Sequence, residues 1–151
     1  MLSFELIAKS IVKTKSYNFA LNIIKLCVKL KDEKHFEITN QLLKSGTSIG
    51  ANVEEALAGQ RKKDFFAKMS IASKEAREAN YWLRLLRDSG LLQKQDINKL
   101  IQISEELIKI LTSIVKTGIE QTKNSKLKTN NVGLYRQSNR PFSQASKRRR
   151  D

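Results

Sequence analysis

The sequence contains very few of the side chains that most often carry chemistry. In 151 residues there is one cysteine, Cys27, and one histidine, His35. An intrachain disulfide and a cluster of histidine and cysteine metal ligands are therefore excluded, and a single histidine cannot supply a di-iron site or serve every catalytic role. We expect no enzyme activity, no cofactor, no metal and no small-molecule substrate. Cys27 lies in an apolar helical segment, where it is expected to be a small buried hydrophobe and not a reactive thiol.

Long apolar stretches are also missing. Lys9, Lys13 and Lys15 interrupt the apolar residues near the N-terminus, so the pattern of a signal peptide is not met. No stretch approaches the ~20 apolar residues that a membrane-spanning helix needs. We therefore expect a cytoplasmic protein without a membrane partner.

The apolar residues that are present recur at the spacing of an amphipathic helix in four segments. These segments are 16–31, 35–58, 63–88 and 94–120, and the breaks between them are short and polar. Short breaks favour antiparallel neighbours. The sequence therefore predicts an all-α fold, an up-down-up-down left-handed four-helix bundle at 16–122, preceded by an N-terminal arm at 1–15 and followed by a disordered basic tail at 123–151.

The first predicted helix has one apolar stripe with a flanking set of apolar residues. Ser16 is a predicted cap, and one stripe consists of Tyr17, Ala20, Ile24 and Cys27; it is flanked by Phe19, Ile23, Leu26 and Leu30.

Two glycines interrupt the second predicted helix. Gly46 and Gly50 each cost up to ~1 kcal/mol relative to alanine in a helix interior, so close packing against a neighbour is expected to offset them. The stripe that contains them and the stripe of the third helix both have small side chains in the middle. This match predicts that the two glycines contact Ala72 and Ala76. A phosphate-binding loop is disfavoured because the Gly-Lys-Ser/Thr ending and a preceding strand are both missing.

The fourth predicted helix has more apolar surface than one bundle needs. Ile103 and Ile110 fall outside its main stripe, and this surplus indicates either a deeply enclosed helix or a subunit contact. Together with Ile71 and Trp82 on the third helix, they form the predicted oligomer interface. A second possibility is a scaffold that recruits a partner protein through Tyr81, Trp82 and these faces.

Polar residues inside the predicted bundle are expected to fix the register of the helices. Asn52, Glu55, Glu75 and Arg77 form the predicted interhelical network of hydrogen bonds and ion pairs. The alternative is a buried cluster of carboxylates; it would consist of Glu54, Glu55, Glu75 and Glu78.

The charge of the chain is strongly positive and uneven. The net charge is +14, and residues 123–151 hold nine lysines or arginines against Asp151 alone, which leaves +6 for residues 1–122. Such an excess favours polyanions. We expect sequence-tolerant binding of RNA or DNA. The predicted binding residues are Arg61, Lys62, Lys63, Arg84, Arg87, Lys147, Arg148, Arg149 and Arg150.

Several short motifs of this sequence resemble those of a bacterial family of four-helix-bundle proteins, which is named after open reading frames in intervening sequences of 23S ribosomal RNA genes. The motifs are Ser16-Tyr17-Asn18-Phe19-Ala20, Gln41-Leu42-Leu43, Ser45-Gly46-Thr47-Ser48-Ile49-Gly50-Ala51-Asn52, Glu55-Ala56, Lys63-Asp64-Phe65, Lys74-Glu75-Ala76-Arg77-Glu78 and Tyr81-Trp82-Leu83. One departure is Arg61, where such proteins often have a small hydroxyl residue that caps the third helix. The basic tail lies outside the resemblance.

The resemblance implies a pentameric ring of up-down-up-down bundles with no known catalytic site. A related branch comprises the accessory variability proteins of diversity-generating retroelements, which are similar in fold, pentameric, and bind nucleic acid and a reverse transcriptase. From residues and resemblance together we expect a non-enzymatic, oligomeric, nucleic-acid-binding accessory protein with ribosomal RNA or a reverse transcriptase as its partner. The alternative is a ring that serves as a protein scaffold and binds polyanions only incidentally.

Overall fold

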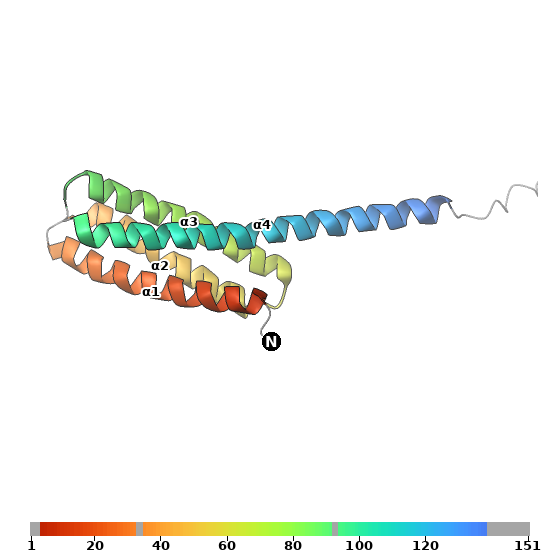
Figure 1. The fold of residues 1–151 in the computed structure, drawn as a ribbon, viewed down its shortest axis with the longest axis horizontal. Helices are drawn as coiled ribbons and strands as arrows, with labels where there is room; N and C mark the ends of the chain where they lie inside the picture. Colours follow the sequence, from red (N-terminus) through yellow and green to blue (C-terminus); the bar gives the residue numbers. More distant parts are fainter. Residues whose placement is uncertain (1–3, 33–34, 92–93, 139–151) are drawn as a thin grey trace, which may run out of the picture. The chain divides into compact units, whose positions relative to one another are not determined.

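Four helices make up almost all of the described structure. The computed structural model describes residues 4–32, 35–91 and 94–138, with side chains described at 6–32, 35–91 and 97–129. The helices are α1 (Phe4–Asp32), α2 (Phe36–Ala58), α3 (Lys62–Asp88) and α4 (Lys94–Ser138). Consecutive helices run in opposite directions and are joined by short turns (Figure 1). The predicted all-α, up-down-up-down bundle is confirmed.

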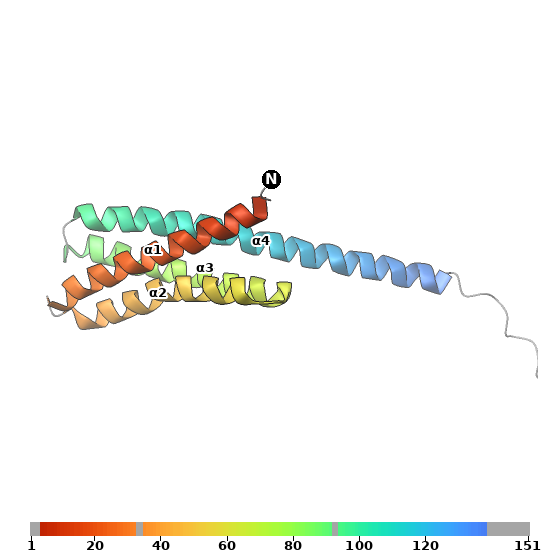
Figure 2. The same cartoon turned by 90° about the horizontal axis from the view of Figure 1, so that it is seen from below.

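The described chain divides into two compact units within α4, the first ending at Lys116 and the second beginning at Thr117. In the first unit, α2 packs against both α1 and α3 (Figure 2). Side chains of α4 form hydrogen bonds with the same two helices: Lys15 of α1 pairs with Glu106, and Asn80 of α3 donates a hydrogen bond to Ser104. α1 and α3 therefore lie at diagonally opposite corners. None of the described helices is long and apolar enough to cross a membrane.

The helices differ from the predicted ones at both ends of the chain. α1 begins at Phe4, so most of the predicted arm at 1–15 is the first part of that helix. Ser16 is not a cap: it is buried in the middle of α1, and its hydroxyl donates to the carbonyl of Lys13 at 3.1 Å. Val12 is fully buried, so the core extends beneath this segment and stabilises it as a helix.

α4 continues past the predicted boundary at Gln121 and is helical as far as Ser138. Asparagine, serine and lysine are polar but do not terminate a helix, whereas proline does, and the first proline of the chain is Pro141. The remaining part of the predicted tail, 139–151, lies outside the described residues.

The two glycines of α2 contact a different helix from the predicted one. A Cβ atom at Gly46 would lie 2.9 Å from Cγ2 of Ile23, and a Cβ atom at Gly50 would lie 3.5 Å from the carbonyl oxygen of Ser16. Both neighbours belong to α1, so the predicted contact of these glycines with Ala72 and Ala76 is wrong. The sequence correctly predicted that the two glycines allow two helices to pack closely, but the helices are α1 and α2.

Alanine at these two positions is expected to have opposite effects on stability. Gly46→Ala places a methyl group against the fully buried Ile23 side chain, and such overpacking costs ~1–3 kcal/mol, more than the ~1 kcal/mol that alanine contributes to a helix. Gly50→Ala meets only ordinary van der Waals contacts, so it should stabilise the bundle by up to ~1 kcal/mol. Urea denaturation of the two variants measures the difference. A Gly46→Ala protein as stable as Gly50→Ala would contradict the close approach.

Candidate nucleic-acid interface

Three cations occupy the turn between α2 and α3. Gly59 ends α2, with its N–H donating to the carbonyl of Glu55 at 3.1 Å. Arg61 then takes an extended conformation as the N-cap residue of α3 and makes no side-chain capping bond, which agrees with the missing hydroxyl residue noted at this position. Arg61, Lys62 and Lys63 are all exposed, and within the described part of the chain none of them forms an ion pair.

The start of α1 lies at this same end of the bundle (Figure 1). The ammonium of Lys9 lies 5.0 Å from the ring centroid of Phe65, in the first turn of α3. Lys13 is paired with Glu54 of α2 at 3.5 Å. Lys9 and Lys13 thus have partners within the bundle, whereas the turn cations form no ion pair among the described residues.

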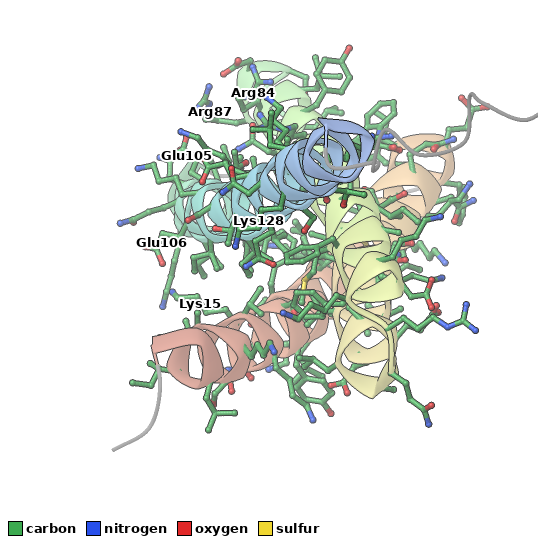
Figure 3. All side chains as sticks on the ribbon, turned by 90° about the vertical axis from the view of Figure 1, so that its right-hand side faces the viewer. Lys15, Arg84, Arg87, Glu105, Glu106 and Lys128 are labelled. Carbon is green, nitrogen blue, oxygen red and sulfur yellow. The ribbon has the colours of Figure 1, made fainter. Side chains whose placement is uncertain are left out.

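The two predicted arginines near the other end of α3 have different partners. Arg87 is paired with Asp88, its Nε lying 2.7 Å from the carboxylate, and this hydrogen bond raises the pKa of Arg87. Arg84 instead donates from Nε to the side-chain oxygen of Asn80 at 2.9 Å. Both arginines are labelled in Figure 3, and Glu105 of α4 acts electrostatically on Arg87. Among the described residues Arg84 has no carboxylate partner, whereas Arg87 has one.

Within the second unit, the described side chains after Gly118 are all exposed. Lys123, Lys126 and Lys128 lie in this helical segment, which has no acidic residue between Glu120 and the end of α4. Hydroxyl side chains bond back to the helix, as in Thr129 to the carbonyl of Ser125. This part of α4 is a predominantly basic helix surface. The predicted binding residues Lys147, Arg148, Arg149 and Arg150 lie outside the described residues.

Three of the four residues of the predicted polar network each bind a different residue. Asn52 donates to the carbonyl of Ser48 in its own helix, and Arg77 donates to the hydroxyl of Thr112 on α4 at 3.1 Å. Glu55 pairs with Lys68 of α3. Burial, followed by repulsion from Glu78, raises the pKa of the Glu75 carboxyl, and Lys44 partly opposes this. These four predicted residues therefore do not form a single connected network of hydrogen bonds and ion pairs.

A buried polar contact that was not predicted joins α3 to α4. Asn80 donates to the hydroxyl of Ser104 at 2.9 Å, and that hydroxyl donates to the carbonyl of Ile101 at 2.6 Å. Both side chains are buried, so the contact fixes the register of α3 against α4.

The chemistry available inside the bundle is limited. In the alternative carboxylate cluster, Glu54 and Glu55 are each paired with a lysine of a neighbouring helix. No group of three histidine, cysteine or acidic residues among the described positions could hold a metal ion. Cys27 is buried, as predicted, and burial raises its pKa to about 11, so its thiol stays protonated at neutral pH.

The predicted oligomer residues lie in different environments. Ile71 is exposed on α3, and Trp82 is partly buried, with its indole N–H pointing to Glu78 at 3.4 Å. Ile103 and Ile110 are partly buried and pack against the core, so they offer less surface for another molecule than Ile71 does.

An exposed apolar stripe lies on α1, and it was assigned to the wrong face from the sequence. It consists of Tyr17, Leu21, Ile24 and Val28, all of them exposed. Tyr17 and Ile24 had been predicted to face the core, but the flanking set does so instead, with Phe19, Ile23 and Leu30 fully buried. The spacing of 17, 21, 24 and 28 is itself helical, and this periodicity could have identified a second apolar face.

Two comparisons with known proteins give matches. The family profile described as 23S rRNA-intervening sequence protein matches residues 8–113. A solved structure from Bacteroides thetaiotaomicron VPI-5482, described as a protein with unknown function from the S23 ribosomal protein family, is 41% identical with a TM-score of 0.69; the match covers 72% of this chain and 98% of that one. A comparison with curated proteins found no match.

Proposed function

Because the chain belongs to the family of 23S rRNA-intervening sequence proteins, we propose that it is a non-enzymatic accessory protein that forms a ring of identical subunits and binds RNA or DNA through the phosphate backbone. The observation that carries this proposal is the set of exposed, unpaired cations at Arg61, Lys62 and Lys63. Because no carboxylate of the described residues pairs with them, their charge is available to phosphates.

The second source of binding energy is the basic part of α4. Its lysines at 123, 126 and 128 are exposed, and each subunit of a ring adds another net charge of +14 to the particle. Backbone contacts of this kind carry no base sequence information. The proposed binding is therefore tolerant of sequence.

Ring formation is supported by two unlike apolar surfaces on one subunit. The first is the α1 stripe of Tyr17, Leu21, Ile24 and Val28. The second is on α3, where Ile71 and Leu85 are exposed and the partly buried Trp82 lies between them in sequence. α1 and α3 lie at opposite corners of the bundle, so one subunit can present its α1 stripe to the α3 surface of the next. Such a head-to-tail contact generates a ring when the rotation closes. The ring number of five rests on the family resemblance alone.

Ribosomal RNA and a reverse transcriptase are the partners we propose from the family and the resemblance. The alternative, a scaffold ring that recruits a protein, is favoured by one observation: Tyr81 is also exposed beside the α3 surface. A scaffold would bind polyanions weakly and without functional consequence.

The test of the proposal is a salt titration of nucleic-acid binding. Purified protein freed of nucleic acid is expected to bind RNA and DNA of unrelated sequences with similar affinity. The affinity should fall steeply with salt, by about 0.9 in log-log slope for every phosphate neutralised on duplex DNA. Fluorescence anisotropy of labelled oligonucleotides measures both quantities. If no binding is seen at low salt, the scaffold function replaces the proposed one.

A further inference from the structure

One face of α3 carries an aromatic ring between cations at helical spacing. Lys74, Arg77, Tyr81 and Arg84 follow one another at intervals of three and four residues, so they share a face, and all four are exposed. We propose that this face is a binding site for single-stranded nucleic acid, in which Tyr81 stacks on a base. This inference rests on the proposed function and adds a specific site and a preferred nucleic-acid form to it.

The ring of Tyr81 is both accessible and supported. Tyr81 is 48% exposed. The ring of Trp82 contacts the Tyr81 ring at a centroid distance of 5.4 Å, with an angle of 67° between the two ring planes. The guanidinium carbon of Arg84 lies 6.0 Å from the centroid of the same ring. An exposed aromatic ring beside a cation is the arrangement on which proteins stack bases of single strands.

The two arginines of this face are held by neutral groups. Arg77 donates to the hydroxyl of Thr112, and Arg84 donates to the side-chain oxygen of Asn80. Asn80 is buried and is anchored in turn on Ser104 of α4, so the position of Arg84 is fixed from inside the bundle. Neutral partners orient a guanidinium without cancelling its charge, so both arginines remain available to phosphates.

Four other cations of the first unit already have a carboxylate partner, which distinguishes this face from them. Lys13, Lys15, Lys68 and Arg87 each have a carboxylate partner; the partners are Glu54, Glu106, Glu55 and Asp88. Lys74 has no such partner among the described residues. The acidic residues nearest the proposed site are engaged elsewhere: Glu78 accepts from Trp82, and Glu105 lies close enough to Arg87 to affect its pKa.

The geometry favours a single strand over a duplex. Along α3 the Cα atoms of Arg77 and Arg84 are about 10 Å apart, from seven residues at ~1.5 Å each, and Tyr81 lies between them. The two arginines can therefore contact phosphates on either side of one nucleotide whose base stacks on the ring. In a duplex the faces of the bases are covered by their neighbours, so the ring of Tyr81 has nothing to stack on.

The experiment compares Tyr81→Leu with Tyr81→Phe, using a 20-nucleotide oligoadenylate and a 20-base-pair RNA duplex as probes. Loss of one stacked base should weaken single-strand binding by about tenfold in Tyr81→Leu, while Tyr81→Phe keeps the affinity because it keeps the ring. Duplex binding should not change in either variant. Trp82 is the only tryptophan and contacts Tyr81, so the single strand should also quench its fluorescence, and Tyr81→Leu should remove that quenching.

Phe36→Leu is the matched control, because it removes an exposed aromatic ring from α2 and should leave single-strand binding unchanged. An equal loss in Phe36→Leu, or no loss of single-strand affinity in a folded Tyr81→Leu protein, would overturn the site. The salt-dependent binding of both probes would then still support the proposed function. If neither probe binds the parent protein, the site and the proposed function fall together.

Discussion

Replacing Leu21 and Val28 together by glutamate is expected to convert the assembled protein into a folded monomer. Leu21 is 41% exposed and Val28 is 58% exposed in a single subunit, so the substitution should leave the bundle itself intact. In a ring the same positions would lie in the subunit contact, where an unpaired carboxylate costs several kcal/mol. Light scattering coupled to size-exclusion chromatography measures the mass, and circular dichroism confirms the fold.

The matched control is the pair Asn18→Glu and Asn22→Glu. These residues are exposed on the same helix but lie outside the apolar stripe, and the control adds the same charge. The control should keep the mass of the parent assembly. A parent protein that is already monomeric at micromolar concentration, or a Leu21/Val28 variant that stays assembled, would show that the α1 stripe is not a subunit contact.

Mixing two damaged proteins tests whether the contact is head-to-tail. A chain with glutamates on the α1 stripe still has its α3 surface, and a chain with Ile71→Glu and Leu85→Glu still has its α1 stripe. One intact contact can form between them, so the mixture should yield a dimer from two proteins that are monomers alone. If the contact instead joined two α1 stripes, the chain with Ile71→Glu and Leu85→Glu would stay assembled on its own, because its α1 stripe is intact.

The helices and their antiparallel order could be predicted because they depend on periodicity and on short polar breaks. The orientation of α1 could not be predicted in the same way. Its two apolar stripes, one containing Phe19 and Ile23 and the other containing Leu21 and Ile24, have the same spacing. Periodicity defines a face but not what covers it, so only packing identifies the stripe that forms the core.

The same reasoning explains the other differences between prediction and structure. Gly46 was correctly predicted to allow a close approach, but its position on α2 does not specify whether α1 or α3 is the neighbour. The contact between Asn80 and Ser104 depends on the relative register of two helices, which no pattern within either helix determines. Among the candidate binding residues, a charge count could not separate Arg84 from Arg87. Their difference lies in the neutral Asn80 beside one and the acidic Asp88 beside the other.

Replacing Arg61, Lys62 and Lys63 together by glutamine is expected to weaken binding of RNA and DNA of every sequence. If each cation neutralises one phosphate, the log-log salt slope should fall by ~3 on duplex DNA, at about 0.9 per contact. The turn lies outside the core and forms no ion pair in the described chain, so unfolding in urea should be unchanged within ~0.5 kcal/mol. Removing residues 123–151 in addition should weaken binding further without unfolding the bundle.

The decisive comparison is with a protein that loses the same charge elsewhere. Lys44, Lys99 and Lys109 are exposed on α2 and α4 and form no ion pair among the described residues, so their joint replacement by glutamine also removes three charges. If binding depended only on net charge, the two triple variants would lose equal affinity and equal slope, and binding would be an incidental property of a basic bundle. A localised interface instead requires a larger loss from the turn variant. That difference persists at physiological salt because direct phosphate contacts are screened less than charges at a distance.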